Sequence, residues 1–492
     1  MGIVLKQSFK NTIILFVGFA IGGLNVLFLY THFLHEDYYG LITFLLSTAN
    51  LLMPLMVLGL QHTIIKFFTS YKTKLERDKF LTSTLVLPLL VIIPLAIIGS
   101  VAYENISDWI SQENPIIKPY TRYIFTIAIF MGFFEVFYAF SKVQLETVVG
   151  NFIKEIFGRI CASFLLLAVF LEWITQEQFI YAMVIVYGVR MHIMMIYAFK
   201  LYRPQLVFKL PDNIKEILSY SFYIIMAGSA GTILLEIDKF MIPQLKQIAE
   251  VAYYSVGVYI ASVIGIPSRA MQQIVNPLTA KELNENNLKE VANLYQKSSI
   301  TLLIAGGLLF LLINVNVKDL YVLINKPEYS VGVLIVLMIS VSELYKLALG
   351  TNGAILSNSK YYRVYFYLSI AMAVSVIIMN KWLIELMGIN GAALATLLVV
   401  LLFSTFKIFY VKKKMQMQPF SLKTLVVLIL TLVFFLIFYF IEFPFHPILN
   451  ILIKTVLITL AYLLIIFKLN ISEEVNVLMS RYLDKMKNPA SK

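Results

Sequence analysis

Long apolar runs alternate with short polar segments along the whole chain. Each run holds about 20 mostly apolar residues, the length that a helix needs to cross the hydrocarbon core of a bilayer. The polar segments between the runs are too short to form a soluble domain, so the pattern predicts an all-α integral membrane protein. The fourteen predicted spans are 11–31, 39–62, 81–101, 120–141, 156–174, 179–199, 217–237, 252–276, 296–315, 331–349, 364–384, 388–410, 422–440 and 448–467.

Composition supports the same class. Of the 492 residues, 60% are of the hydrophobic types and 14% are charged, whereas soluble domains have about 45–50% and 25%. The net charge of +12 does not indicate a nucleic-acid partner, because the basic residues lie in short clusters between apolar runs and not on one face. The single cysteine, Cys161, excludes an intrachain disulfide and a zinc-cysteine site.

The basic residues predict the orientation in the membrane. If the N-terminus is cytoplasmic, 30 Lys and Arg residues fall in cytoplasmic segments and 8 in extracytoplasmic ones. Cytoplasmic loops carry the excess of Lys and Arg in membrane proteins. We therefore expect both termini on the cytoplasmic side.

Similar residues recur at a nearly constant offset, which predicts an internal duplication. Pro54 recurs as Pro267, 213 residues later, and Glu135-Val136-Phe137 recurs as Glu343-Leu344-Tyr345 after 208 residues. Each repeat holds six spans, an even number, so both repeats enter the membrane from the same side. Such parallel repeats are related by an axis along the membrane normal, and we expect two six-helix bundles around a central cavity.

This duplication divides the chain into four parts. The tail after the last span carries apolar residues at helical spacing beside basic ones, which favours a helix on the membrane surface, although a partly frayed tail fits the sequence equally well. The predicted parts are the first bundle at 1–200, the second at 201–415, spans 13 and 14 at 416–470, and an amphipathic cytoplasmic tail at 471–492.

Ionisable residues inside spans are the candidate functional groups, because they are costly in hydrocarbon unless they face protein or water. Glu135 and Glu343 lie at equivalent positions of the two repeats, Lys346 follows Glu343 on the same helix face, and Arg190 lies in the sixth span. Glu343 and Lys346 either neutralise each other or line a polar cavity. Glu135 has no cation within four residues, which favours cavity lining or proton coupling.

Charged residues at span ends leave two interpretations open. Asp238 and Lys239 either close the outward face or mark the membrane surface, and Arg269 either reflects topology or lines a cavity mouth for an anionic substrate. No nucleotide-binding loop and no paired catalytic residues occur in the sequence, so an enzyme is not indicated. Transport would then be facilitated or driven by an ion gradient.

The sequence resembles the Wzx-type polysaccharide-export flippases, in the superfamily that also holds the MATE-type multidrug exporters and the lipid II flippase MurJ. The resemblance covers nearly the whole chain. It is carried by Glu236-Ile237-Asp238-Lys239-Phe240-Met241-Ile242 with Tyr253-Tyr254-Ser255-Val256, by Tyr39-Gly40-Leu41 with Leu58-Gly59-Leu60, and by Gly388-Ile389-Asn390-Gly391-Ala392-Ala393-Leu394-Ala395-Thr396.

The resemblance implies a flippase of the bacterial cytoplasmic membrane that moves undecaprenyl-pyrophosphate-linked oligosaccharide to the outer leaflet for surface polysaccharide such as O-antigen. It implies membrane lipid, a polysaccharide polymerase and a chain-length regulator as partners, no nucleic acid, and no cofactor beyond H⁺ or Na⁺ coupling. On this basis the candidate pyrophosphate contacts are Arg190, Lys346 and Arg269, the candidate ion-coupling residues are Glu135 and Glu343, and the candidate gate residues are Asp238 and Lys239.

Two relatives offer alternative functions. A MATE-like drug or metabolite antiporter would have twelve spans where fourteen are predicted. A lipid II flippase is marked by arginines in its first two spans, whereas neither 11–35 nor 41–63 contains a charged residue. Glycan export is therefore the favoured function.

Overall fold

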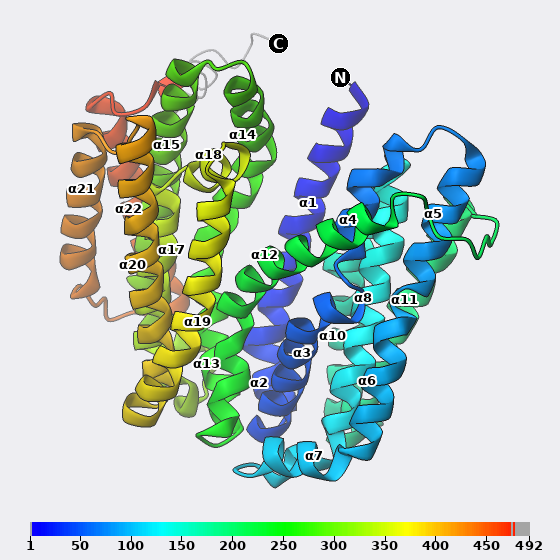
Figure 1. Ribbon diagram of the computed structural model, residues 1–492. Helices are drawn as coiled ribbons and strands as arrows, with labels where there is room; N and C mark the ends of the chain where they lie inside the picture. The colour runs from blue at the N-terminus through cyan, green and yellow to red at the C-terminus, as the bar shows by residue number, and fades with distance from the viewer. Residues whose placement is uncertain (1, 474–475, 478–492) are drawn as a thin grey trace, which may run out of the picture. The chain divides into compact units, whose positions relative to one another are not determined.

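The structure, a computed structural model, describes residues 2–473 and 476–477, and every element among them is a helix (Figure 1). Two compact units are distinguished by their internal packing. The first comprises the described residues up to 255 together with 380–389, and the second comprises 256–379 and those from 390 onward. The division into two units reflects packing and does not test the predicted duplication of six-helix repeats. The predicted boundary at residue 200 therefore stays a prediction.

The first unit contains the helices up to the start of α13. Two of its helix runs include a π-helical segment, η1 and η4, in line with the helix on either side. The elements are α1 (Gly2–Leu24), η1 (Asn25–Leu29), α2 (Tyr30–Phe33), α3 (Glu36–Met56), α4 (Leu60–Phe67), η2 (Phe68–Ser70), α5 (Lys74–Val86), α6 (Leu89–Val101), α7 (Tyr103–Ser111), η3 (Pro115–Tyr120), α8 (Thr121–Val143), α9 (Val148–Phe152), η4 (Ile153–Phe157), α10 (Gly158–Phe170), α11 (Gln176–Leu201), α12 (Ile214–Met241), η5 (Ile242–Gln244) and α13 (Ala249–Ser262).

The second unit begins at Val256, within α13, and residues 380–389 at the junction of α19 and α20 belong to the first unit. Its elements are η6 (Val263–Gly265), α14 (Ile266–Asn284), α15 (Leu288–Asn314), α16 (Val317–Ile324), η7 (Pro327–Gly332), α17 (Val333–Ala348), α18 (Asn352–Asn358), α19 (Tyr362–Met387), α20 (Ile389–Met415), α21 (Leu422–Tyr439) and α22 (Pro447–Lys468).

Thirteen helices of the described residues are long and apolar enough to cross a membrane, and each corresponds to a predicted span. The remaining predicted span, 156–174, is not among them. The chain there is helical from Val148 to Phe170, but Lys154, Glu155 and Arg159 lie within it. These three charges make the helix too polar to be counted as a span by composition.

Local sequence explains where several helices begin and end. The polar segment before α11 is a capping box: Thr175 Oγ1 accepts from the Gln178 amide at 3.1 Å, and Gln178 Oε1 accepts from the Thr175 amide at 2.9 Å. Such a box satisfies amides that a helix start leaves unpaired. Gly59 and Gly388 adopt positive φ angles of 61° and 59°, which glycine tolerates without strain. They separate α3 from α4 and α19 from α20.

In the first unit α8 is a central helix. It packs against α3, α4 and α11, and α12 packs against α3 and α4. Buried side chains of α8 include Ile127, Ala128 and Phe134. This placement brings the polar residues of α8 between neighbouring helices and keeps them away from lipid.

In the second unit α15 packs against α14, α17, α21 and α22. Its core contains Leu302 and Leu311 of α15 together with Val427 of α21 and Tyr462 of α22. The final helix pair is therefore part of this core. Large apolar side chains on the outer faces of α21 and α22, such as Leu425 and Leu460, are exposed, as expected for helices that face lipid. The predicted amphipathic tail lies outside the described residues except at 471–473 and 476–477.

Candidate functional site

A group of charged side chains lies around one half of α8, the half that the predicted topology places on the cytoplasmic side. Glu135 Oε1 is 2.7 Å from Lys154 Nζ, and the Glu135 side chain is 14% exposed. Glu135 belongs to α8 and Lys154 to the π-helical segment η4. No cation lies close to Glu135 along the chain, so the fold supplies the partner.

Arg190 of α11 and Lys142 of α8 complete this group. The Arg190 guanidinium carbon lies 4.1 Å from the centre of the Phe134 ring and 5.6 Å from that of Tyr187, distances at which cation–π attraction operates. Lys142 Nζ lies 3.9 Å from the Tyr138 ring centre. Both cations interact electrostatically with Glu135. We call Glu135, Lys142, Lys154 and Arg190 the α8 charge cluster, which holds three cations and one carboxylate.

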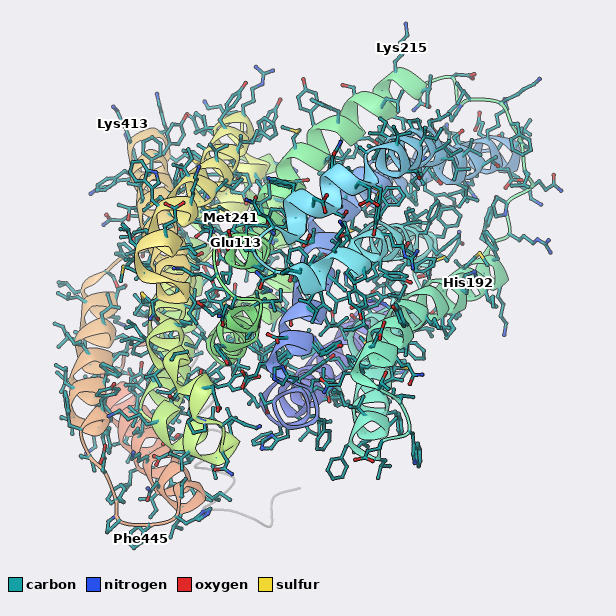
Figure 2. The ribbon with its side chains drawn as sticks, turned by 90° about the horizontal axis from the view of Figure 1, so that it is seen from below. Glu113, His192, Lys215, Met241, Lys413 and Phe445 are labelled. Atoms are coloured by element: carbon teal, nitrogen blue, oxygen red, sulfur yellow. The ribbon has the colours of Figure 1, made fainter. Side chains whose placement is uncertain are left out.

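Within this cluster Arg190 has unused hydrogen-bonding capacity. Its Nε is buried and has no hydrogen-bond partner among the described residues. A guanidinium offers five N–H donors in a planar fork that suits phosphate and carboxylate. His192, two residues further along α11 and labelled in Figure 2, is exposed, and its Nδ1 lies 2.8 Å from the Gly188 carbonyl oxygen. His192 therefore does not pair with Arg190.

Hydrogen bonds join the helix run that carries Lys154 to the first span. Asn25, which is buried in η1, donates to the Arg159 carbonyl oxygen at 2.8 Å and accepts from Ser163 Oγ at 2.6 Å. A Cβ at Gly18 would lie 2.7 Å from Arg159 Nη1, closer than real Cβ contacts. Gly18 thus allows α1 to approach the η4 run, and the contact holds the C-terminal side of η4 in place.

The second unit contains a related pair. Glu343 Oε1 is 2.6 Å from Lys346 Nζ, both on α17. Lys407 of α20 interacts electrostatically with Lys346 and lies 5.0 Å from the Tyr365 ring centre. Tyr345 and Thr405 join α17 to α20 through a 2.6 Å hydrogen bond between their hydroxyls. Of the two interpretations for Glu343 and Lys346, the geometry supports mutual pairing, with Lys407 as a further cation.

The predicted gate residues take different partners. Asp238 of α12 is 3% exposed. It accepts hydrogen bonds from the Tyr254 hydroxyl and, at 2.6 Å, from Asn380 Nδ2. Such burial does not fit a residue that marks the membrane surface.

Lys239, the next residue, forms an ion pair with a different carboxylate, that of Glu236. Its Nζ lies 2.7 Å from Glu236 Oε2, and Glu236 Oε1 accepts from Asn50 Nδ2 at 3.0 Å. The two neighbours therefore belong to separate networks within the first unit.

Arg269 lies apart from the other predicted residues. Its side chain is exposed on α14. The structure brings Arg190 within electrostatic range of Glu135 and Lys346 into contact with Glu343. The residues that sequence reasoning missed are Lys142, Lys154, Lys407, Tyr254 and Asn380. The predicted topology assigns Lys142 and Lys154 to a cytoplasmic segment, so no signal in the sequence indicated that they would approach Glu135.

No group of three or more His, Cys, Asp and Glu side chains that could hold a metal ion occurs in the described part of the chain. The charged residues can still bind an anion, and their carboxylates can take up a proton or a monovalent cation.

The sequence matches two family models. The model of the polysaccharide biosynthesis protein family matches residues 8–269, which is more than half of the 492 residues. The model of the MatE family matches residues 224–383. No curated protein matches the chain.

Solved structures show the same fold at low sequence identity. The lipid II flippase MurJ in an inward closed conformation has a TM-score of 0.72 and 14% identity, with 93% of this chain and 98% of that chain covered. An inward-facing multidrug resistance MATE family transporter of the MOP superfamily has a TM-score of 0.60 and 12% identity, covering 82% and 94%. The MATE multidrug transporter DinF-BH has a TM-score of 0.57 and 13% identity, with 84% of this chain and 95% of that chain covered. The chain is therefore a member of the polysaccharide biosynthesis protein family, with the fold of the MOP-superfamily membrane transporters.

Proposed function

We propose that this protein is a flippase that carries undecaprenyl-pyrophosphate-linked oligosaccharide units across the bacterial cytoplasmic membrane for surface polysaccharide synthesis. Membership of the polysaccharide biosynthesis family supports glycan export. Similarity in fold to a lipid II flippase supports a lipid-linked substrate. A polysaccharide polymerase and a chain-length regulator are the partners that we expect downstream.

The observation that carries this proposal is the α8 charge cluster. Its three cations exceed its one carboxylate by two positive charges, around the predicted cytoplasmic half of α8. Ionisable groups beside apolar helices are costly unless they face protein, water or a counterion. A diphosphate diester carries one negative charge on each phosphate and would balance the excess. Arg190, Lys346 and Arg269 remain the proposed contacts of the pyrophosphate, and Lys142 and Lys154 join them.

Coupling to a gradient of H⁺ or Na⁺ is part of the proposal. Glu135 and Glu343 are the proposed carriers, because each is an acid at an equivalent position of its repeat and each is paired with a lysine. Asp238 and Lys239 are the proposed gate, and both termini are proposed to be cytoplasmic.

The test is the sidedness of polyprenyl-linked oligosaccharide in a bacterial strain that lacks the protein. We expect the glycan to accumulate on the cytoplasmic leaflet and to return to the outer leaflet when the gene is restored. Normal outer-leaflet delivery in a strain without a paralogue would contradict the proposal. Restoration with the Arg190→Gln variant tests the cluster, and we expect this variant to return less glycan to the outer leaflet than the unaltered protein does.

A MATE-like antiporter is the second candidate function, favoured by the MatE match over residues 224–383. It predicts raised resistance to cationic compounds when the protein is overproduced. A net-positive cluster would repel such substrates, so the charges favour the flippase. A lipid II flippase is distinguished by mass analysis of the glycan that accumulates.

A further inference from the structure

We propose that Glu135 is a displaceable counterion. Its carboxylate forms an ion pair with Lys154 until an anionic phosphate of the lipid-linked substrate replaces it as the partner of Lys154. This inference rests on the proposed function for the identity of the ligand. It gives Glu135 a role in substrate binding in addition to its proposed role in ion coupling.

The exposure of the two partners supports displacement. The Glu135 side chain is 14% exposed, whereas the Lys154 side chain is 40% exposed. The ammonium can therefore be approached from its open side while the carboxylate stays covered. An anion that arrives there meets a cation whose present partner lies 2.7 Å away on another helix.

The surplus of cations around Glu135 distinguishes this pair from simple neutralisation. One carboxylate would suffice for Lys154, but Lys142 and Arg190 also interact with Glu135, and neither has an ion-pair partner of its own among the described residues. Buried charges are stabilised by partners of opposite sign. A second anion at this place would supply the partners that Lys142 and Arg190 lack, and Arg190 could bind it with both edges of its guanidinium.

The backbone that carries Lys154 favours its movement. Lys154 lies in η4, a five-residue π-helical segment, and single π-turns inside α-helices are frequent at functional sites. A return from π-helical to α-helical hydrogen bonding shifts the residues on one side by one position without unfolding the helix. Hydrogen bonds hold both flanks of η4: Asn25 contacts Arg159 and Ser163 on the C-terminal side, and Asn11 contacts Thr147 and Asn151 on the N-terminal side. A shift would therefore be confined to η4 itself, which carries Lys154.

An ion pair outside the cluster offers a matched control. Glu104 Oε2 of α7 lies 3.4 Å from Lys118 Nζ of η3, so this carboxylate, like Glu135, pairs with a lysine on another element. Glu104→Gln removes the same chemical group as Glu135→Gln without touching the α8 charge cluster or any proposed contact of the pyrophosphate.

The experiment measures binding of inorganic pyrophosphate to the purified full-length protein in detergent micelles by isothermal titration calorimetry. We expect Glu135→Gln to lower the Kd about tenfold, because the competing carboxylate is gone, and Lys154→Gln to raise it about tenfold. Glu104→Gln should leave the Kd within about twofold. Absence of pyrophosphate binding by the unaltered protein, or no tightening in Glu135→Gln, would overturn the proposal.

A double variant separates displacement from general repulsion. If Glu135 competes for Lys154, the tightening caused by Glu135→Gln disappears when Lys154→Gln is also present. Equal tightening in both backgrounds would mean that Glu135 acts only through its charge, and the counterion role would be wrong. Should Glu135→Gln not be recovered as a monodisperse protein, Glu135→Asp replaces it. Its shorter side chain weakens the pair, and we expect tightening of about threefold, with none overturning the proposal.

These measurements do not require a glycan, a membrane potential or transport. Tightening in Glu135→Gln with normal sidedness of the glycan in the deletion strain would retain the counterion and reject the proposed substrate. Defective sidedness without tightening would retain the flippase and reject the counterion.

Discussion

Asn380 Nδ2 donates a 2.6 Å hydrogen bond to the Oδ1 of Asp238, and both side chains are fully or almost fully buried. The two residues lie on α19 and α12, so one bond joins elements that are distant in sequence. Asp238 also accepts from Tyr254. The last part of α19 belongs to the first unit.

Removing this bond should destabilise the protein. We expect Asn380→Ala to lower the free energy of unfolding by about 1–3 kcal/mol, because it removes one buried partner of a carboxylate. The melting temperature of the purified protein measures the effect. Asn358→Ala, at an exposed position of α18, is the control. Equal melting temperatures for both variants would contradict the importance of the bond.

Glu135 and Glu343, the acids at equivalent positions of the predicted repeats, provide a test of ion coupling. We expect Glu135→Gln and Glu343→Gln each to reduce gradient-driven export several-fold, because neither amide can carry a proton or attract Na⁺. Export is measured as the rate at which the lipid-linked glycan reaches the outer leaflet. If both variants keep full export, the coupling assignment is wrong.

Arg190 should not be replaceable by lysine. Arg190→Lys keeps the charge but loses the planar group that lies 4.1 Å from the Phe134 ring centre and the fork that suits phosphate. We expect export to fall by about tenfold and the melting temperature to change little. Phe134→Leu tests the positioning of the guanidinium, and unaltered export in both variants would exclude a role for this geometry.

Gly40 should not tolerate a side chain. A Cβ there would lie 2.0 Å from the Ile248 carbonyl oxygen, so Gly40→Ala forces backbone apart. We expect a clear loss of folded protein on size-exclusion chromatography. Gly99→Ala is the matched control, because a Cβ at Gly99 meets nothing within 4 Å, and alanine favours the helix by about 1 kcal/mol.

The last helix depends on a buried ion pair. Lys454 of α22 is 4% exposed, and its Nζ lies 3.0 Å from Asp319 Oδ2 of α16. Lys454→Met leaves Asp319 without its cation and should cost about 3–5 kcal/mol, whereas Lys454→Met with Asp319→Asn should cost less. Thermal unfolding of the single and double variants tests this order, and a more stable single variant would refute it.

The sequence allows much of the membrane architecture to be predicted. Thirteen of the fourteen predicted spans are helices of sufficient length and hydropathy, because runs of apolar residues are the direct requirement of the bilayer. The predicted span 388–410 begins at Gly388, and Gly388, with a positive φ, is the residue that separates α19 from α20. The difference at 156–174 arises because the helix ends at Phe170, four residues before the predicted end, so every stretch of spanning length within Val148–Phe170 includes Lys154, Glu155 and Arg159.

The site was only partly predictable. Glu135 and Arg190 were identified because ionisable residues inside apolar runs are rare. Lys154 could not be identified as the partner of Glu135, because their proximity depends on how α8 packs beside the η4 run. Asp238 lies near a span end in the sequence, and its burial depends on Asn380, which is more than a hundred residues away.

The inclusion of residues 380–389 in the first unit has a consequence for biosynthesis. The ribosome must translate most of the second unit before these residues emerge, so the first unit cannot be completed while it is being inserted. Asp238 is therefore inserted into the membrane before Asn380, which donates its hydrogen bond, has been synthesised. A ribosome that stalls between the two would leave a first unit without residues 380–389 and Asp238 without its hydrogen bond from Asn380.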